Sequence, residues 1–148
     1  MAKDGTVSER YWLVKQEPAD YPWSKFVQER STPWTGVRNF QARNHLRSMG
    51  LGDRVLYYHS GPDKAVVGLA KVSRTAYADP TARDGDWSAV DLLAVCPLTE
   101  PVSLAAIKKD PVLKAMPLVR NSRLSVTPVA HNQFRRLLAL SRTALPRP

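Results

Sequence analysis

Flat aromatic side chains are the residues of this sequence best suited to a definite chemistry, the stacking of nucleic-acid bases. They are Trp12, Trp23, Trp34, Trp87 and the pair Tyr57-Tyr58. A base stacked on such a ring gains about 1–3 kcal/mol whatever its identity. Trp34 stands out because the turn-like run 32–36 leads directly into Asn39 at a predicted helix N-terminus, where an amide can read a base edge and phosphate is attracted. Most tryptophans in a domain of this size lie in the core, which is the expectation for Trp12 and Trp87.

A second stretch, residues 118–125, combines two arginines with hydroxyl and amide side chains. Arg120 and Arg123 are three residues apart and lie close in sequence to the apolar Leu118 and Leu124. Charged groups are costly to hold beside apolar ones without partners. The pattern favours a cleft in which these groups contact phosphate or a base, and the alternative is a solvated loop.

The sequence lacks the common catalytic signatures. It contains no G-x-x-x-x-G-K-[ST] phosphate loop, no G-x-G-x-x-G, no H-E-x-x-H and no G-x-S-x-G. His45, His59 and His131 are too far apart for helical metal-ligand spacing, and Cys96 is expected to be a buried, inert thiol. Glu17 and His59 remain an alternative acid–base pair, although a positioning role for His59 is favoured. We therefore expect no enzyme, no metal and no cofactor.

Positive charge is concentrated in two segments of the chain. The net charge is +9, and residues 30–52 and 111–148 hold eleven of the 22 basic residues and none of the 13 acidic ones. Charge segregated in this way raises the local concentration of polyanions, of which nucleic acid is the commonest inside cells. The alternative is a generally basic protein whose arginines serve solubility.

Length and composition indicate one soluble domain. The 148 residues, 43% of them hydrophobic, are enough to bury one core. A single cysteine excludes an internal disulfide, and the sequence shows neither a signal peptide nor an apolar run of about 20 residues. These features predict a cytoplasmic monomer without a membrane partner, associated with the nucleoid if bacterial and nuclear if eukaryotic.

The elements that must position these residues are short and mixed. Strands are expected at residues 11–14, 53–60, 65–78 and 86–97, with a turn at 61–63. Helices are expected after Asp20, over 39–49, after Ser103, at Asp110-Pro111 and over 130–140. In the helix at 39–49, Ala42, Leu46 and Met49 share one face, and Gly50 is expected to end it with φ > 0. The twelve prolines between these elements favour a small mixed barrel.

Four motifs, in this order, resemble the EVE domain. The first runs from Tyr11 to Pro18 and the second from Trp34 to Asn44. The third is Tyr57-Tyr58-His59-Ser60, and the fourth runs from Leu118 to Val126. The resemblance extends from residue 11 to about 140. We therefore expect a mobile segment over 1–10, an EVE domain over 11–141 and a short tail over 142–148.

The resemblance implies an α+β, PUA-like fold, a curved β-barrel flanked by short helices and related to the YTH domain. It also implies a reader of modified bases, with modified cytosine in DNA favoured. Carried over by motif, the implied base pocket consists of Lys15, Glu17, Trp34, Val37, Asn39, Tyr58, His59, Ser60, Arg120, Ser122, Arg123 and Leu124. Three positions depart from the usual pattern: Gln16 replaces serine, Asn121 replaces glutamine, and Ala130 replaces a hydroxyl residue that would cap the last helix.

Together, these features predict a non-catalytic module that holds a base flipped out of a nucleic-acid strand. The base is expected between Trp34 and an apolar wall that includes Leu124, with Asn39, Ser60 or backbone groups reading its edge. Phosphates are expected on Arg38, Arg43, Arg47, Arg120 and Arg123. Two alternatives stay open: a small nucleic-acid-processing enzyme that uses Glu17 and His59, and a module for small ligands or proteins whose basic surface is incidental.

Overall fold

A six-stranded sheet with the strand order β2-β5-β4-β3-β1-β6 forms the centre of the structure. The computed structural model describes residues 10–146. The strands are β1 (Tyr11–Gln16), β2 (Ser31–Trp34), β3 (Arg54–His59), β4 (Ala65–Ala78), β5 (Ser88–Ser103) and β6 (Val126–Val129). β1 and β3 are parallel, and the other neighbouring pairs are antiparallel. The parallel pairing brings the carboxyl ends of β1 and β3 together, with Gln16 opposite His59.

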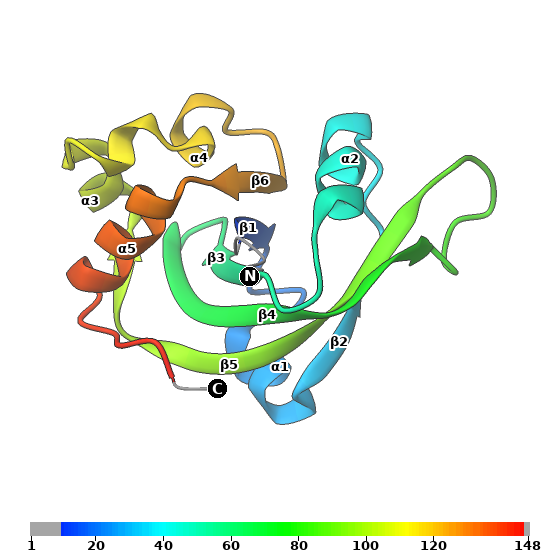
Figure 1. Ribbon diagram of the computed structural model, residues 1–148, viewed down its shortest axis with the longest axis horizontal. Coiled ribbons are helices and arrows are strands. Elements are labelled where there is room, and N and C mark those ends of the chain that lie inside the picture. The colour runs from blue at the N-terminus through cyan, green and yellow to red at the C-terminus, as the bar shows by residue number, and fades with distance from the viewer. Residues whose placement is uncertain (1–9, 147–148) are drawn as a thin grey trace, which may run out of the picture.

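Short helices cover the sheet. They are α1 (Trp23–Glu29), α2 (Phe40–Ser48), α3 (Leu104–Lys109), α4 (Pro117–Arg120) and α5 (His131–Leu140), with one 3-10 turn at Leu113–Ala115. Figure 1 shows α3, α4 and α5 grouped on one side of the molecule and α2 on the other. Within residues 10–146, no helix has the length and apolar character needed to cross a membrane.

The two longest strands give the sheet its curvature. β4 and β5 pair with four shifts of register, the first of them between Val66 and Gly68. Irregularities of this kind bend a strand and increase its twist. In Figure 1 the two strands pass beneath β1 and β3 and then extend outward as a hairpin beside α2. The turn of this hairpin, residues 79–87, therefore lies on the α2 side of the molecule.

The curved sheet separates two apolar cores, because successive side chains of a strand point to opposite faces. Val14 and Tyr57 lie in one core with α1 and α2. Leu13 and Leu56, each one residue earlier in its strand, lie in the other core with α3 and α5. The same alternation decides which face of the sheet each predicted site residue occupies.

Several predicted elements are confirmed. Ala42, Leu46 and Met49 are all buried, as the helical spacing predicts. Residues 61–63 join two antiparallel strands, and the Ser103 side chain caps α3 by accepting a hydrogen bond from the Ala106 N–H. The expected α+β class is confirmed by this arrangement.

Other local predictions are wrong. The residue that ends α2 is Met49, with an extended backbone, and the glycine with positive φ is Gly52 rather than Gly50. α1 begins after Pro22 and has no side-chain cap, so Asp20 does not start it. Residues 32–34, the first part of the expected turn-like run 32–36, belong instead to the edge strand β2, because they pair with β5.

The predicted terminal segments fall largely at the limits of the structure. Residues 1–9 of the expected mobile segment lie outside the described residues, as do residues 147–148 of the expected tail. At the C-terminal end of the domain, α5 ends at Leu140. The next residue, Ser141, is buried, and its hydroxyl donates to the Leu138 carbonyl at 2.9 Å.

Candidate nucleic-acid interface

The end of β1 is joined to the segment 118–125 through Lys15. Its backbone N–H donates to the Ser125 carbonyl at 2.9 Å, and its Nζ donates to the Ser122 carbonyl at 2.6 Å. Burial lowers the pKa of the Lys15 ammonium group. On the other side, the Ser60 N–H donates to the Gln16 carbonyl at 3.0 Å. The structure therefore brings Lys15, Ser60 and Ser122 to one end of the sheet.

Glu17 and His59 lie at the same end but have separate partners. A Cβ atom on Gly61 would lie 2.5 Å from both Glu17 carboxylate oxygens, so this carboxylate packs directly on a glycine with φ of +68°. His59 is buried, and its Nε2 accepts from the Trp23 N–H at 3.0 Å while its Nδ1 lies 3.0 Å from Asp63 Oδ2. An accepting Nε2 leaves the proton on Nδ1, which then donates to Asp63. Both nitrogens of His59 thus have a positioning role, one toward the first residue of α1 and the other toward the turn between β3 and β4.

Trp34, Val37 and Leu124 meet in a single apolar core. Their exposed fractions are 6%, 8% and 4%. Tyr57 contacts Trp34 edge-on, with ring centroids 5.7 Å apart and planes at 81°. Tyr58 belongs to the opposite core, so the tyrosine beside Trp34 is Tyr57.

Asn39 is exposed and caps α2. Its Oδ1 accepts from the Ala42 N–H at 2.9 Å, which satisfies one of the free amides of the first helical turn. Among residues 10–146, no group accepts a hydrogen bond from the Asn39 side-chain amide nitrogen. That N–H₂ group remains available to an external acceptor.

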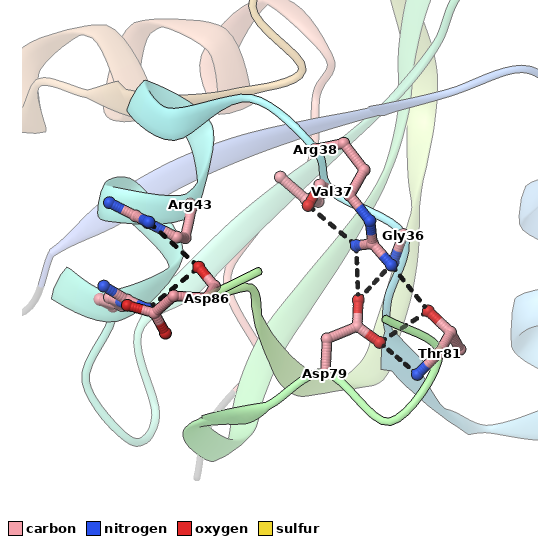
Figure 2. A network of polar contacts seen from close by, with 8 residues as sticks. Gly36, Val37, Arg38, Arg43, Asp79, Thr81 and Asp86 are labelled. Atoms are coloured by element: carbon pink, nitrogen blue, oxygen red, sulfur yellow. Dashed lines mark hydrogen bonds and ion pairs between the residues drawn. The ribbon is translucent and has the colours of Figure 1, made fainter. Parts of the chain in front are cut away.

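The arginines on and before α2 are held by the β4–β5 turn. Arg38 pairs with Asp79 at 2.9 Å, and Arg47 pairs with Asp86 at 2.6 Å. Arg43 instead donates to the backbone carbonyl of Asp86 at 3.0 Å and to the Asn44 amide oxygen. Figure 2 shows the contacts of Arg38 with Asp79 and of Arg43 with Asp86 joining the two segments. Of the three arginines in this group that are predicted to bind phosphate, Arg38 and Arg47 therefore already have a carboxylate partner.

Asp79 is the most strongly bound of these carboxylates. Its side chain is fully buried and accepts from the Gly36 N–H at 2.8 Å, from Arg38, and from both the N–H and the hydroxyl of Thr81. Burial by itself raises the pKa of Asp79, but the hydrogen bonds from Gly36, Thr81 and Arg38 outweigh it and hold this pKa well below its usual value. Asp79 therefore stays ionised and fixes the backbone just before α2.

Arg120 and Arg123 contrast with this group. Both are exposed, Arg120 as the last residue of α4 and Arg123 in the turn that follows it. Within the described part of the chain, no carboxylate lies within 4.0 Å of either guanidinium group. Their charge is available to a ligand.

The sequence matches the EVE domain over residues 10–140. The chain belongs to the EVE domain family. Thymocyte nuclear protein 1 from Mus musculus is 33% identical, over 90% of this chain and 74% of that protein. The match to the family confirms what the four motifs predict.

Solved structures share the fold of this EVE domain. Rpa0253 from Rhodopseudomonas palustris is 43% identical with a TM-score of 0.86, over 90% of this chain and 93% of that one. The human THYN1 protein, solved in complex with DNA containing 5-methylcytosine, is 29% identical with a TM-score of 0.83, over 93% of this chain and 100% of that one. An ASCH protein from Zymomonas mobilis, at 14% identity and a TM-score of 0.53, shares the fold alone. These likenesses confirm the predicted PUA-like fold.

Three hollows on the described part of this EVE domain are lined by none of the residues of the implied base pocket. One of about 460 Å³ is lined by Tyr11 and residues of α5 and beyond, and a second of about 290 Å³ lies beside it. A third, also about 290 Å³, lies between Val27 and residues 93–97. No group of three metal-ligating side chains is found within residues 10–146.

Sequence reasoning placed two side chains wrongly and overlooked another. Trp12 is a core residue as expected, with 4% exposure, but Trp87 is only half-buried and stacks on Phe40. Cys96, expected to be buried, is also half-buried. The overlooked residue is Asp79, whose role depends on partners about 40 positions away. The sequence did contain one indication of this contact: residues 79–86 are acidic, whereas residues 30–52 carry basic residues and no acidic ones.

Proposed function

We propose that this EVE domain is a non-catalytic nucleic-acid-binding module that recognises one modified base, flipped out of its strand. Modified cytosine in DNA is the favoured target. The observation that carries the proposal is the match to the human THYN1 protein, which was solved with DNA containing 5-methylcytosine and whose entire chain aligns with this one.

The local geometry supports a base site near Trp34. Trp34 and Leu124, the two sides of the proposed slot, lie in one apolar core. Because Trp34 is only 6% exposed, a base can stack on it only after the groups that cover it move aside, and in this proposal the moving part is the segment 118–125. The Lys15–Ser122 hydrogen bond would open in that movement.

The polar and charged groups around this slot have complementary roles in the proposal. The free amide nitrogen of Asn39 donates to the base edge, and the exposed Arg120 and Arg123 hold phosphates on either side of the flipped nucleotide. Extrusion of a base from a duplex costs a few kcal/mol, which stacking, edge hydrogen bonds and phosphate contacts together must exceed. A buried methyl group adds only about 0.8 kcal/mol, so discrimination by the methyl alone is modest.

A binding role is favoured over catalysis by the state of His59. A general base needs a free nitrogen within reach of a substrate proton. Both His59 nitrogens are occupied, by the Trp23 N–H and by Asp63. No hydrogen bond joins His59 to Glu17 within residues 10–146.

The proposal is tested by measuring affinity for oligonucleotides that carry cytosine, modified cytosines or modified adenines, in wild type and in Trp34→Leu. Leucine keeps an apolar side chain but removes the aromatic stack, so affinity for the preferred modified base should fall by roughly 5- to 150-fold, the equivalent of about 1–3 kcal/mol.

Trp12→Leu is the matched control, because Trp12 is a buried tryptophan of the same core whose Nε1 donates to Asp53. It should lower the free energy of unfolding while leaving the affinity of the folded protein unchanged. Equal affinities of wild type and Trp34→Leu would show that Trp34 is a core residue only. Cleavage or conversion of the oligonucleotide that is lost in His59→Ala would favour the enzyme alternative.

A further inference from the structure

An aromatic pair that the proposed base site does not use lies at the start of α2. Phe40, the first residue of α2, is 65% exposed. Trp87, from the β4–β5 turn, is half-buried and stacks on it, with ring centroids 5.1 Å apart and planes at 17°. The part of the Phe40 ring that Trp87 leaves exposed to water would gain from the hydrophobic effect if a ligand covered it.

Two guanidinium groups lie against these rings. Arg43 is 5.0 Å from the Phe40 centroid and 5.8 Å from the Trp87 centroid, and Arg38 is 5.7 Å from the Trp87 centroid. Cations at these distances are attracted by the ring faces. The result is a surface on which an aromatic face and positive charge are presented together.

The surrounding contacts hold this surface in place. Arg38 pairs with Asp79, and Arg43 donates to the backbone carbonyl of Asp86, so both ends of the turn that carries Trp87 are tied to the α2 side (Figure 2). Gly85 approaches Trp87 so closely that a Cβ atom there would lie 2.7 Å from the indole Nε1. The stacked pair is therefore positioned before any ligand arrives.

Arg43 differs from its neighbours in charge balance. Its hydrogen-bond acceptors are a backbone carbonyl and an amide oxygen, both uncharged. Within the described residues, no carboxylate lies within 4.0 Å of its guanidinium group. Arg43 therefore presents uncompensated positive charge beside the exposed ring of Phe40.

We propose that Phe40 and Arg43 form a second nucleotide contact, in which an unpaired base stacks on Phe40 and Arg43 binds the adjoining phosphate. An aromatic ring next to a cation is the combination with which proteins bind single-stranded nucleic acid without regard to sequence. This inference rests on the proposed function and adds to it the nucleotide that neighbours the flipped one. Phe40 follows Val37 by three residues, so their Cα atoms are at most about 11 Å apart, within reach of adjacent nucleotides.

The test is fluorescence anisotropy with a labelled single-stranded DNA oligonucleotide that carries 5-methylcytosine, at several salt concentrations. Phe40→Ala and Phe40→Leu should each weaken binding about tenfold, because both remove the stack, and Phe40→Trp should bind at least as tightly as wild type. Arg43→Gln should reduce the slope of log affinity against log salt concentration by about one. Thermal unfolding should be nearly unchanged in the Phe40 variants, because the side chain is mostly exposed.

Leu51→Ala supplies the matched control. Leu51 is 70% exposed and lies beyond the other end of α2, so its loss removes a comparable apolar side chain far from the ring pair. Its affinity should equal that of wild type. Wild-type affinity in Phe40→Leu or in Phe40→Ala would overturn the second contact. The proposed function would still stand in that case if Trp34→Leu weakens binding, whereas a wild-type protein that binds no oligonucleotide would remove both.

Discussion

The arginines near α2 and the arginines of residues 118–125 carry the same charge but are held in different ways. Arg38 and Arg47 are paired with Asp79 and Asp86 of the β4–β5 turn. Arg120 and Arg123 are exposed, without a carboxylate within 4.0 Å among residues 10–146.

The difference separates Arg38, whose buried carboxylate partner stabilises the fold, from arginines that can serve a ligand. A pair with a fully buried carboxylate stabilises the native backbone, and replacing that carboxylate leaves its donors unsatisfied. An exposed arginine without a partner contributes little to stability and can bind phosphate at little cost. A count of charges along the sequence does not distinguish the two groups.

The largest loss of stability is expected from replacing Asp79. Asp79→Ala removes the acceptor of four hydrogen bonds and leaves the Gly36 N–H without its partner. We expect a loss of about 3 kcal/mol in the free energy of unfolding, measured by urea denaturation. Asp86→Ala is the control, since the Asp86 side chain is 80% exposed. Equal losses in both variants would contradict the distinction between the two carboxylates.

The stability of the protein at acid pH should depend on Asp79. The pKa of Asp79 is lower in the folded than in the unfolded protein, where an aspartate has a pKa of about 3.9. Its contribution is therefore complete above about pH 4 and is lost as the pH falls below that value toward the folded pKa. Unfolding measured between pH 2 and 7 should show a shallower acid decline in Asp79→Asn than in wild type. Parallel curves would assign the loss of stability at acid pH to other groups, such as Asp110. Burial raises the pKa of Asp110, but hydrogen bonds from Leu113, Arg136 and Val112 outweigh it and lower this pKa.

Arg120 and Arg123 should show the opposite behaviour. The double variant Arg120→Gln, Arg123→Gln should unfold at nearly the wild-type temperature but bind the preferred oligonucleotide about tenfold more weakly. The slope of log affinity against log salt should fall by about two, one for each lost phosphate contact. A large drop in stability with unchanged affinity would show that these arginines are structural.

The smallest expected effect belongs to the Arg47–Asp86 pair. The Arg47 side chain is 36% exposed and that of Asp86 is 80% exposed, so solvent screens their attraction. Arg47→Ala should cost less than about 1 kcal/mol in the free energy of unfolding, and added salt should reduce that cost. A loss of stability comparable to that of Asp79→Ala would mean that the Arg47–Asp86 pair stabilises the fold as strongly as the contacts of Asp79 do.

Local patterns in the sequence determined the elements and the family. The spacing of Ala42, Leu46 and Met49 predicts α2, and the motifs from Tyr11 to Val126 predict the EVE domain, because periodicity and short motifs are properties of neighbouring residues. The segregation of basic residues is likewise visible without a structure.

Only the tertiary structure decided which of these residues meet. The long β4–β5 hairpin brings Asp79 to Arg38 across 41 positions and stacks the half-buried Trp87 on Phe40, while Trp34 is buried against Tyr57. These contacts depend on strand length, register shifts and the face on which each side chain falls. A change of one residue in register moves a side chain to the other face of a sheet, and such long-range pairing leaves no local pattern in the sequence.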